Sequence, residues 1–397
     1  MTTTPSTPSA AGRAPVMILV IAATLLGLMG TDLVLPAVPT LPEALGGDAA
    51  TAQLVLASYV AGTCAGLLAY GALADRFATR TLFVGSLALT AGLSLACALA
   101  PSVEALVVLR LLQGAVAAGP AVFAPGIIRA LHDGPGAVRA LGLLGSVEAL
   151  APAFAPLLGV WLLALGGWRL SFTVIAGLAL LLALVIAAGG LLPQTARRAA
   201  GSYARLLSDL VYLRYALSQA FTLGGLLTFV FGMPAVFVRA LGGDLGDFVT
   251  MQIAGIATFM LAANLTGRLS GRFGAERLIA GGTLLSLGGA AATLTYALAG
   301  GTDPMLYAAL FVPVNAGLGL RGPPGFYRAV VAAGGDDARG SALVILGILA
   351  ATALGTVAAA PFIERGPAPL ALTALVLHLL AALTLAVLPR LKEQPAD

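Results

Sequence analysis

Charged side chains are scarce in this 397-residue chain, where Asp, Glu, Lys and Arg together make up 10% of the sequence. Soluble domains carry about 25% charged residues. Hydrophobic residues make up 59% of the chain, and its mean hydropathy is +1.00. A chain this poor in charge is not an ordinary water-soluble protein, so the composition indicates an integral membrane protein with no sizeable soluble domain.

Cysteine and histidine are also scarce, with two of each. Cys64 and Cys97 both fall inside apolar runs, which excludes a disulfide framework and a metal cluster. The sequence has no HExxH, paired-histidine or Ser/His/Asp grouping in those runs, and no nucleotide-binding P-loop. We therefore expect no enzyme activity, no catalytic residue, no metal, no cofactor and no use of ATP.

Long apolar runs are what the chain has in abundance. A helix needs about 20 apolar residues to cross a hydrocarbon layer about 30 Å thick, and the runs show none of the alternation of barrel strands. We predict an all-α membrane protein in which twelve helices span the bilayer. Their expected positions are 16–36, 52–74, 82–100, 103–128, 140–164, 169–192, 210–238, 248–268, 278–299, 305–327, 341–361 and 368–389.

The runs divide the chain into two halves of six helices each. We expect a disordered tail at 1–14, a first half at 15–192, a cytoplasmic linker at 193–209, a second half at 210–389 and a cytoplasmic tail at 390–397. Small polar residues in the first segment favour disorder.

Basic residues indicate the orientation, because cytoplasmic loops carry the excess of Lys and Arg. With both termini inside, Arg169, Arg239 and Arg365 fall outside, Arg110 falls within a span, and the remaining basic residues fall on the inner side. The net charge of +4 therefore reflects topology and gives no reason to expect nucleic acid as a partner.

The two halves contain a repeat. "GALADRFATRTLFVG" (71–85) aligns with "GRLSGRFGAERLIAGG" (267–282), and each copy joins the second and third spans of its half. Two halves in the same orientation, with a site at the midplane between them, are typical of one transporter architecture.

The first copy resembles the loop signature of the major facilitator superfamily, G-x-L-a-D-r-x-G-r-r, with Ala78 at its second glycine. "TDLVLPAVPTL" (31–41), "LRLLQGAVAAG" (109–119) and "ALAPAFAPLLGVWL" (149–162) resemble segments of drug:proton antiporters, closest to the bicyclomycin and chloramphenicol resistance branch. The last segment keeps only scattered parts of the family's G-x-x-x-G-P-x-x-G-G pattern, which weakens the antiport inference.

The resemblance implies that Asp75 helps latch the halves together on the cytoplasmic side, by facing the start of the eleventh span near Gly340 and Ser341. The second copy has Gly271 at the matching position, so such a latch is asymmetric. In the alternative reading, the arginines of the motif only mark the inner face. Besides Asp75, the expected latch includes Gly71, Arg76 and Arg80.

Ionisable groups at membrane depth cost about 2.5 to 3.5 kcal/mol each on insertion scales, so each one requires a partner or a function. Asp32 and Arg110 are expected at similar depth, and Arg110 begins the R-x-x-Q-G motif that the family ties to proton coupling, with Gln113 one turn on. A guanidinium stays charged, so the group that exchanges protons must be an acid beside it, and we choose Asp32. Alternatively, the two form a permanent ion pair that braces two helices.

Glu148 and Arg321 are the other candidates. Glu148 is a possible second proton site or a counterion for a cationic substrate, and otherwise a polar residue at the inner cavity mouth. Arg321 either pairs with it, meets an anionic substrate group, or reaches toward lipid headgroups. Lower-ranked residues, each of which is better explained by ordinary helix packing, are Tyr59, Gln219, Phe229, Met233, Asn264 and Asn315.

From these features we expect a proton-coupled exporter of a small amphipathic compound, acting as a monomer in the bacterial inner membrane. Its other partners are protons and membrane lipid. A proton-coupled importer or uniporter of a metabolite remains the alternative, because one fold serves many functions. A receptor or scaffold would leave the buried charges without a role.

Overall fold

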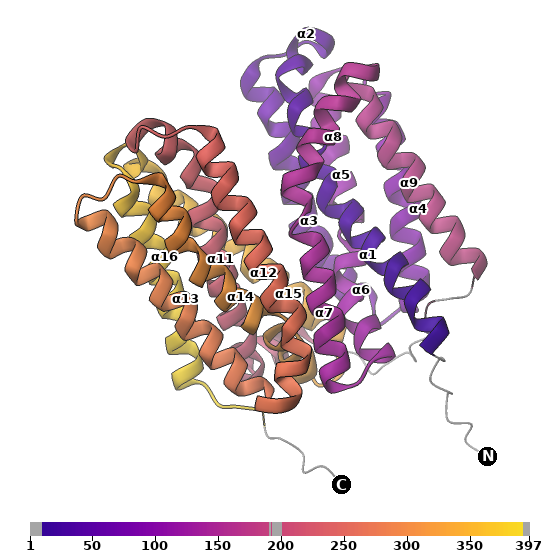
Figure 1. The fold of residues 1–397 in the computed structure, drawn as a ribbon. Coiled ribbons are helices and arrows are strands. Elements are labelled where there is room, and N and C mark those ends of the chain that lie inside the picture. Colours follow the sequence, from indigo (N-terminus) through magenta and orange to yellow (C-terminus); the bar gives the residue numbers. More distant parts are fainter. Residues whose placement is uncertain (1–9, 190–191, 193–200, 392–397) are drawn as a thin grey trace, which may run out of the picture. The chain divides into compact units, whose positions relative to one another are not determined.

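The computed structural model describes residues 10–189, 192 and 201–391, which form helices joined by short turns (Figure 1). Twelve helical stretches of this part are long and apolar enough to cross a membrane. Each predicted run overlaps one of them, so the predicted all-α fold is confirmed. The predicted tail segments 1–9 and 392–397, and most of the predicted linker (193–200), lie outside the described residues.

The chain forms two compact units by its contacts. Unit 1 contains residues 1–133, 147–201 and 336–342. Within it, α3 packs against α5, and α4 packs against α9. Its elements are α1 (Ala10–Asp32), the 3₁₀ turn η1 (Leu35–Thr40), α2 (Leu41–Leu45), α3 (Ala49–Leu73), α4 (Thr79–Ala98), α5 (Val103–Ala117), α6 (Gly119–Leu131), α8 (Ala151–Gly166), α9 (Trp168–Gly189) and the first turn of α15 (Asp337–Ala359).

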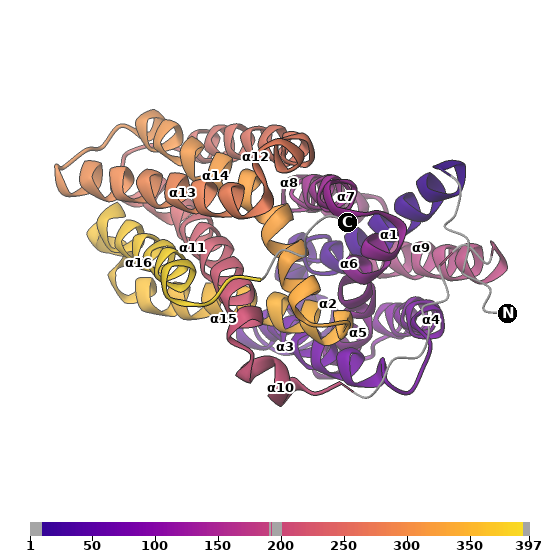
Figure 2. The same cartoon turned by 90° about the horizontal axis from the view of Figure 1, so that it is seen from below.

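Unit 2 contains residues 134–146, 202–335 and 343–397. In it α14 lies between α12 and α13, and α11 lies against α16 (Figure 2). Its elements are most of α7 (Gly134–Glu148), α10 (Tyr203–Ser208), α11 (Leu210–Ala240), α12 (Leu245–Phe273), α13 (Ala275–Leu298), α14 (Pro304–Ala332), the rest of α15, the 3₁₀ turn η2 (Ala360–Arg365) and α16 (Pro367–Val387).

The units differ from the predicted halves in two segments. Residues 134–146 join unit 2 because α7 packs closely against α12, where the Asn264 amide donates a hydrogen bond to Ser146 Oγ at 2.9 Å. Residues 336–342 join unit 1 through charged contacts described below. The first helix also begins at Ala10, inside the predicted tail, since alanine is the strongest helix former.

Many of the few polar residues cap helix N-termini, where the first backbone N–H groups lack partners. The side chain of the N-cap residue accepts a backbone hydrogen bond at the start of α3, α5, α11, α12 and α14. These residues are Asp48, Ser102, Asp209, Asp244 and Asp303.

The fifth predicted span is interrupted in the middle. α7 ends at Glu148, and α8 begins at Ala151 with Pro152 in its first turn. Proline has no N–H to donate to the carbonyl four residues earlier, and its ring clashes with that carbonyl. The carbonyl concerned belongs to Glu148, so the break positions the carboxyl of this residue at a helix end.

The two copies of the repeat make different turns. Gly274, between α12 and α13, has a φ of 82°, which glycine adopts without strain. Its counterpart Ala78, before α4, has a φ of −64° in extended backbone. The alanine at the signature's glycine position is therefore accommodated by a turn that needs no left-handed residue.

Candidate functional site

The first group of candidate residues lies around Arg110 on α5 in unit 1. Arg110 is completely buried. Its Nε donates to the Val55 carbonyl oxygen at 3.1 Å, and its Nη1 donates to Gln113 Oε1 at 2.7 Å. Its Nη2 has no hydrogen-bond partner among the described residues. The guanidinium is thus held by uncharged acceptors and retains an unused donor.

Tyr59 on α3 joins Arg110 to α1. The Arg110 guanidinium carbon lies 4.1 Å from the centre of the Tyr59 ring, a cation–π contact. The Tyr59 hydroxyl donates to the Gly27 carbonyl oxygen at 2.7 Å. Because α3, α5 and α1 all meet at this side chain, Tyr59 fixes the Arg110 end of the group.

Asp32 is half-buried at the end of α1 and interacts electrostatically with Tyr59. Among the described residues, no ion pair joins it to Arg110. The structure therefore brings Asp32, Tyr59 and Arg110 together without the direct contact that the alternative of a permanent ion pair requires.

Gln113 continues the polar chain from α5 to α4. Its Nε2 donates to Ser94 Oγ at 2.6 Å, and Ser94 in turn donates to the Thr90 carbonyl oxygen at 2.6 Å. The Cys97 thiol lies 3.7 Å from Gln113 Oε1. Gln113 is buried, so it positions Arg110 from within the helix bundle of unit 1.

Glu148 is half-buried at the break between α7 and α8. The Thr24 side chain on α1 lies close to its carboxyl group, while the Thr24 hydroxyl donates to the Ile21 carbonyl oxygen at 3.0 Å. Among the described residues no ion pair is formed with Glu148. Glu148 thus lies against α1, the helix that ends at Asp32, in unit 1.

Arg321 is the corresponding buried cation of unit 2. It is completely buried on α14, and its Nη1 and Nη2 donate to the Ser218 carbonyl oxygen at 2.9 Å and to Ser218 Oγ at 3.0 Å. Arg321 Nε and the buried Gln219 Oε1 have no hydrogen-bond partners in the described part of the chain. Arg321 therefore lies inside unit 2 rather than reaching to headgroups.

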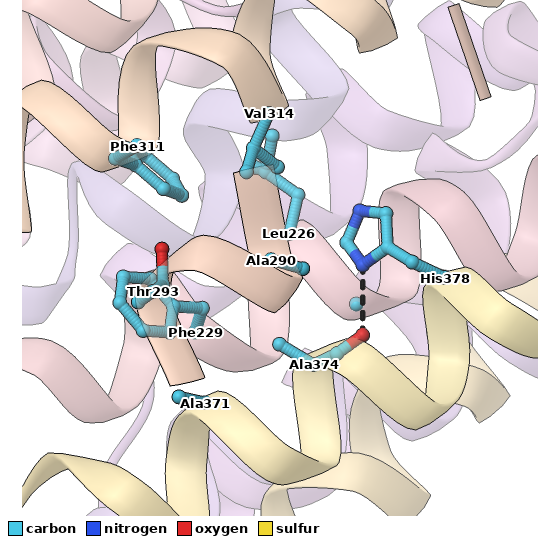
Figure 3. A pocket seen from close by; sticks show the side chains of 10 residues that line it. Leu226, Phe229, Ala290, Thr293, Phe311, Val314, Ala371, Ala374 and His378 are labelled. Atoms are coloured by element: carbon cyan, nitrogen blue, oxygen red, sulfur yellow. Dashed lines mark hydrogen bonds between the residues drawn. The ribbon is translucent and has the colours of Figure 1, made fainter. Parts of the chain in front are cut away.

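The remaining candidates of unit 2 fall into two kinds of environment. Phe229 stacks on Phe311 with ring centres 5.3 Å apart, and both line a small cavity (Figure 3). Met233 is completely buried in the apolar core, and Asn315 donates to the Phe311 carbonyl oxygen in its own helix at 3.0 Å.

Asp75, in the turn between α3 and α4, forms an ion pair with the first turn of α15. Arg339 Nη2 lies 2.6 Å from Asp75 Oδ2, and Nη1 lies 2.9 Å from Oδ1. The Gly201 N–H donates to Asp75 Oδ1 at 3.3 Å. The hydrogen bonds from Arg339 hold the pKa of Asp75 below its usual range, against the opposing effect of burial.

A second ion pair holds the same turn of α15. Arg129 at the end of α6 donates to both carboxylate oxygens of Asp337, at 2.5 and 2.6 Å from Nη2.

The other residues of the loop motif lie in different surroundings. Arg80 donates to the Ala187 carbonyl oxygen near the end of α9 at 2.8 Å. Arg76 is exposed, and Gly71 is buried in the last turn of α3.

Sequence reasoning missed Arg129, Asp337 and Arg339, because it located the latch partner at Gly340 and Ser341. The signal was present in "GGDDARG" (334–340), a group of charges directly before an apolar run, as in "GALADRFATR" (71–80). In the described residues, no group of three or more His, Cys, Asp or Glu could hold a metal ion.

Residues 20–359 match the family model of the Major Facilitator Superfamily. The chain is 33% identical to a chloramphenicol resistance protein of Pseudomonas aeruginosa over 66% of each chain. It is 25% identical to a bicyclomycin resistance protein homolog of Haemophilus influenzae over 63% of this chain and 65% of that protein.

The fold also matches solved structures. The E. coli fucose:proton symporter FucP superposes with a TM-score of 0.70 at 18% identity, covering 93% of this chain and 98% of that one. The sequence matches span slightly less than two thirds of the two resistance proteins. The twelve candidate spans, together with the bacterial origin of these relatives, support a multi-pass protein of the inner membrane. The chain belongs to the major facilitator superfamily of membrane transporters and resembles its drug:proton antiporter branch.

Proposed function

We propose that this transporter exports small amphipathic compounds in exchange for protons by alternating access. The observation that carries the proposal is the group of Asp32, Tyr59 and Arg110, in which the half-buried acid and the buried cation both interact with Tyr59, while no ion pair joins them among the described residues. Burial favours the protonated acid and a nearby cation favours the ionised one, so small changes in hydration shift the balance.

Asp32 is the proton-exchanging group in this proposal. Arg110 supplies a permanent positive charge, which Gln113 and Tyr59 keep in place. When the site opens outward, a proton binds Asp32 and cargo leaves; when it opens inward, the proton leaves and new cargo binds. Glu148, against the same helix, serves as a second proton site or as a counterion for a cationic cargo.

In the proposal, candidate residues for cargo contact come from each unit taken by itself. These residues are Asp32, Tyr59, Gln113, Glu148, Gln219, Phe229, Met233, Asn315 and Arg321. Pockets of this kind combine apolar walls with a few polar groups. The names of the two resistance proteins make chloramphenicol and bicyclomycin the first compounds to test.

Both termini lie in the cytoplasm, as the distribution of the basic residues favours. The protein acts as a monomer. The contacts of Asp75 with Arg339, and of Arg129 with Asp337, support a latch that fixes the start of α15 in one conformation of the cycle. In this role Asp75→Asn impairs transport while substrate binding stays measurable.

A growth-inhibition panel in a bacterial host without major efflux pumps tests the function. Expression of the chain should raise the inhibitory concentration of at least one compound, and Asp32→Asn, present at equal amount in the membrane, should abolish this protection. Glu43→Gln is the control, because it removes the charge of an exposed carboxylate on α2. If Glu43→Gln keeps the protection and Asp32→Asn loses it, the loss comes from proton coupling at Asp32 and not from the removal of a negative charge in general. Energised uptake of a metabolite without any protection would favour the importer instead.

A further inference from the structure

Three arginines lie together in unit 2, where α7 begins and α12 ends. Arg139 is in the second turn of α7, and Arg268 and Arg272 are in the last two turns of α12. A Cβ on Gly267 would lie 2.7 Å from Arg139 Cβ, so Arg139 lies directly beside the residue that precedes Arg268. All three arginine side chains are exposed. We call these three residues the arginine patch.

The arginine patch has no countercharge in the described part of the chain. Arg139 and Arg268 make no hydrogen bond, ion pair or ring contact there. Arg272 contacts only the ring of Phe273, with its guanidinium carbon 5.3 Å from the ring centre. Other arginines near helix ends donate to carbonyl or carboxylate oxygens of the protein; these are Arg80, Arg129, Arg205, Arg214 and Arg339. Three neighbouring positive charges repel one another, so the patch favours a bound anion.

Exposed leucines continue the arginine patch along both helices. On α12, Leu261 and Leu265 come seven and three residues before Arg268, the spacing of one helix face. They are 67% and 42% exposed. On α7, Leu143 is 44% exposed one turn after Arg139. Because α12 ends and α7 begins at the patch, the leucines of both helices lie further into the span than the arginines, by about 11 Å for Leu261 at about 1.5 Å per residue.

A phospholipid with an anionic headgroup matches this arrangement. Guanidinium groups bind phosphate oxygens through paired hydrogen bonds, and clusters of arginines at the ends of spans attract anionic lipids. The acyl chains of the same molecule cover the exposed leucines, which a soluble phosphate would leave uncovered. A zwitterionic headgroup carries its own cation and would leave the charge of the patch uncompensated.

We propose that the arginine patch is a binding site for an anionic phospholipid. The lipid phosphate contacts the three arginines, and the acyl chains run along the exposed leucines of α7 and α12. The proposal requires only that the protein lies in a membrane, and it is independent of the exported compound and of proton exchange.

Native mass spectrometry of the full-length protein, purified in detergent and freed of bound lipid, tests the site. The probes are dioleoyl phosphatidylglycerol, which is anionic, and dioleoyl phosphatidylcholine, which has the same chains and no net charge. The wild type should prefer phosphatidylglycerol. The double variant Arg268→Gln and Arg272→Gln should bind phosphatidylglycerol about 30-fold more weakly, roughly fivefold for each charge removed. Its binding of phosphatidylcholine should not change.

Arg365→Gln is the matched control. Arg365 lies over the Phe362 ring at 4.9 Å, much as Arg272 lies over Phe273. It belongs to η2, which follows the patch after three further spans and therefore lies at the opposite end of the unit 2 helices. This variant should keep the preference of the wild type. Replacing Arg268 and Arg272 by lysine keeps both charges and should retain most of the preference.

Equal binding of the two lipids by the wild type, unchanged binding by the glutamine double variant, or the same loss in Arg365→Gln would overturn the proposal. Displacement of the lipid by inorganic phosphate would also overturn it, because the site would then serve a soluble anion. The substituted arginines are exposed, so melting temperatures near that of the wild type should confirm that the variants fold. If the double variant does not fold, Arg139→Gln decides the matter. The measurement needs no transport, so a failed growth panel leaves this result independent.

Discussion

Arg110 and Arg321 are both completely buried, yet neither pairs with a carboxylate among the described residues. Each guanidinium donates to uncharged acceptors and retains one nitrogen that has no hydrogen-bond partner among the described residues. A buried charge without a countercharge is costly. At the scale of single residues, these two groups therefore cost stability.

Gln113→Leu is expected to destabilise the protein, because it removes the acceptor of Arg110 Nη1 and the donor to Ser94. Leaving buried polar groups unpaired costs about 1 to 3 kcal/mol. Thermal unfolding of the purified variant measures the loss. Thr295→Ala is the control, since this exposed hydroxyl bonds only within its own helix. Equal melting temperatures for Gln113→Leu and wild type would refute the network's structural role.

The pKa of Asp75 is lowered in the folded protein, chiefly by its hydrogen bonds from Arg339. The folded state thus binds fewer protons at this site than the unfolded state does. The stabilisation is complete above the ordinary aspartate pKa of about 3.9 and is lost as the pH falls through the lower folded value.

The difference in melting temperature between wild type and Asp75→Asn should therefore be constant from about pH 8 to about pH 5. Differential scanning fluorimetry across this range checks it. A difference that shrinks between pH 8 and pH 6 would show that the carboxyl is protonated in the folded state, contrary to the pairing with Arg339.

At the scale of elements, α3 and α5 pack so closely that Gly62 has no room for a side chain. A Cβ on Gly62 would lie 1.9 Å from the Leu111 carbonyl oxygen. Gly62→Ala should separate the helices and cost at least about 1 to 3 kcal/mol, as overpacking does.

Gly92→Ala on α4 is the matched control, because a Cβ there meets nothing within 4 Å. It should be neutral or slightly stabilising. Melting temperatures of the two variants measure the contrast, and equal values would contradict the close approach of α3 and α5.

The spans could be predicted from the sequence because continuous apolar runs of sufficient length report directly on membrane crossing. The break at Glu148 was harder to locate, since Pro152 and Pro156 both lie within the run and only Pro152 lies at the start of α8. The conformation of the turn at Ala78 could not be predicted either, because a single sequence does not specify which backbone conformation a turn adopts.

At the scale of the whole molecule, the sequence identified the charged candidates, because charges inside apolar runs are conspicuous. Their partners were not predictable. Tyr59 and Ser218 come from helices distant in sequence. Contacts between helices that are distant in sequence depend on how the helices pack, and apolar runs do not determine which helices pack together.

The most direct test of the account uses proteoliposomes that contain a pH-sensitive dye and a compound identified by the growth panel. An imposed gradient of that compound should move protons in the opposite direction with wild type and with Glu43→Gln, but not with Asp32→Asn. If Asp32→Asn moves protons as fast as the wild type, Asp32 is not the coupling group and the central claim is wrong.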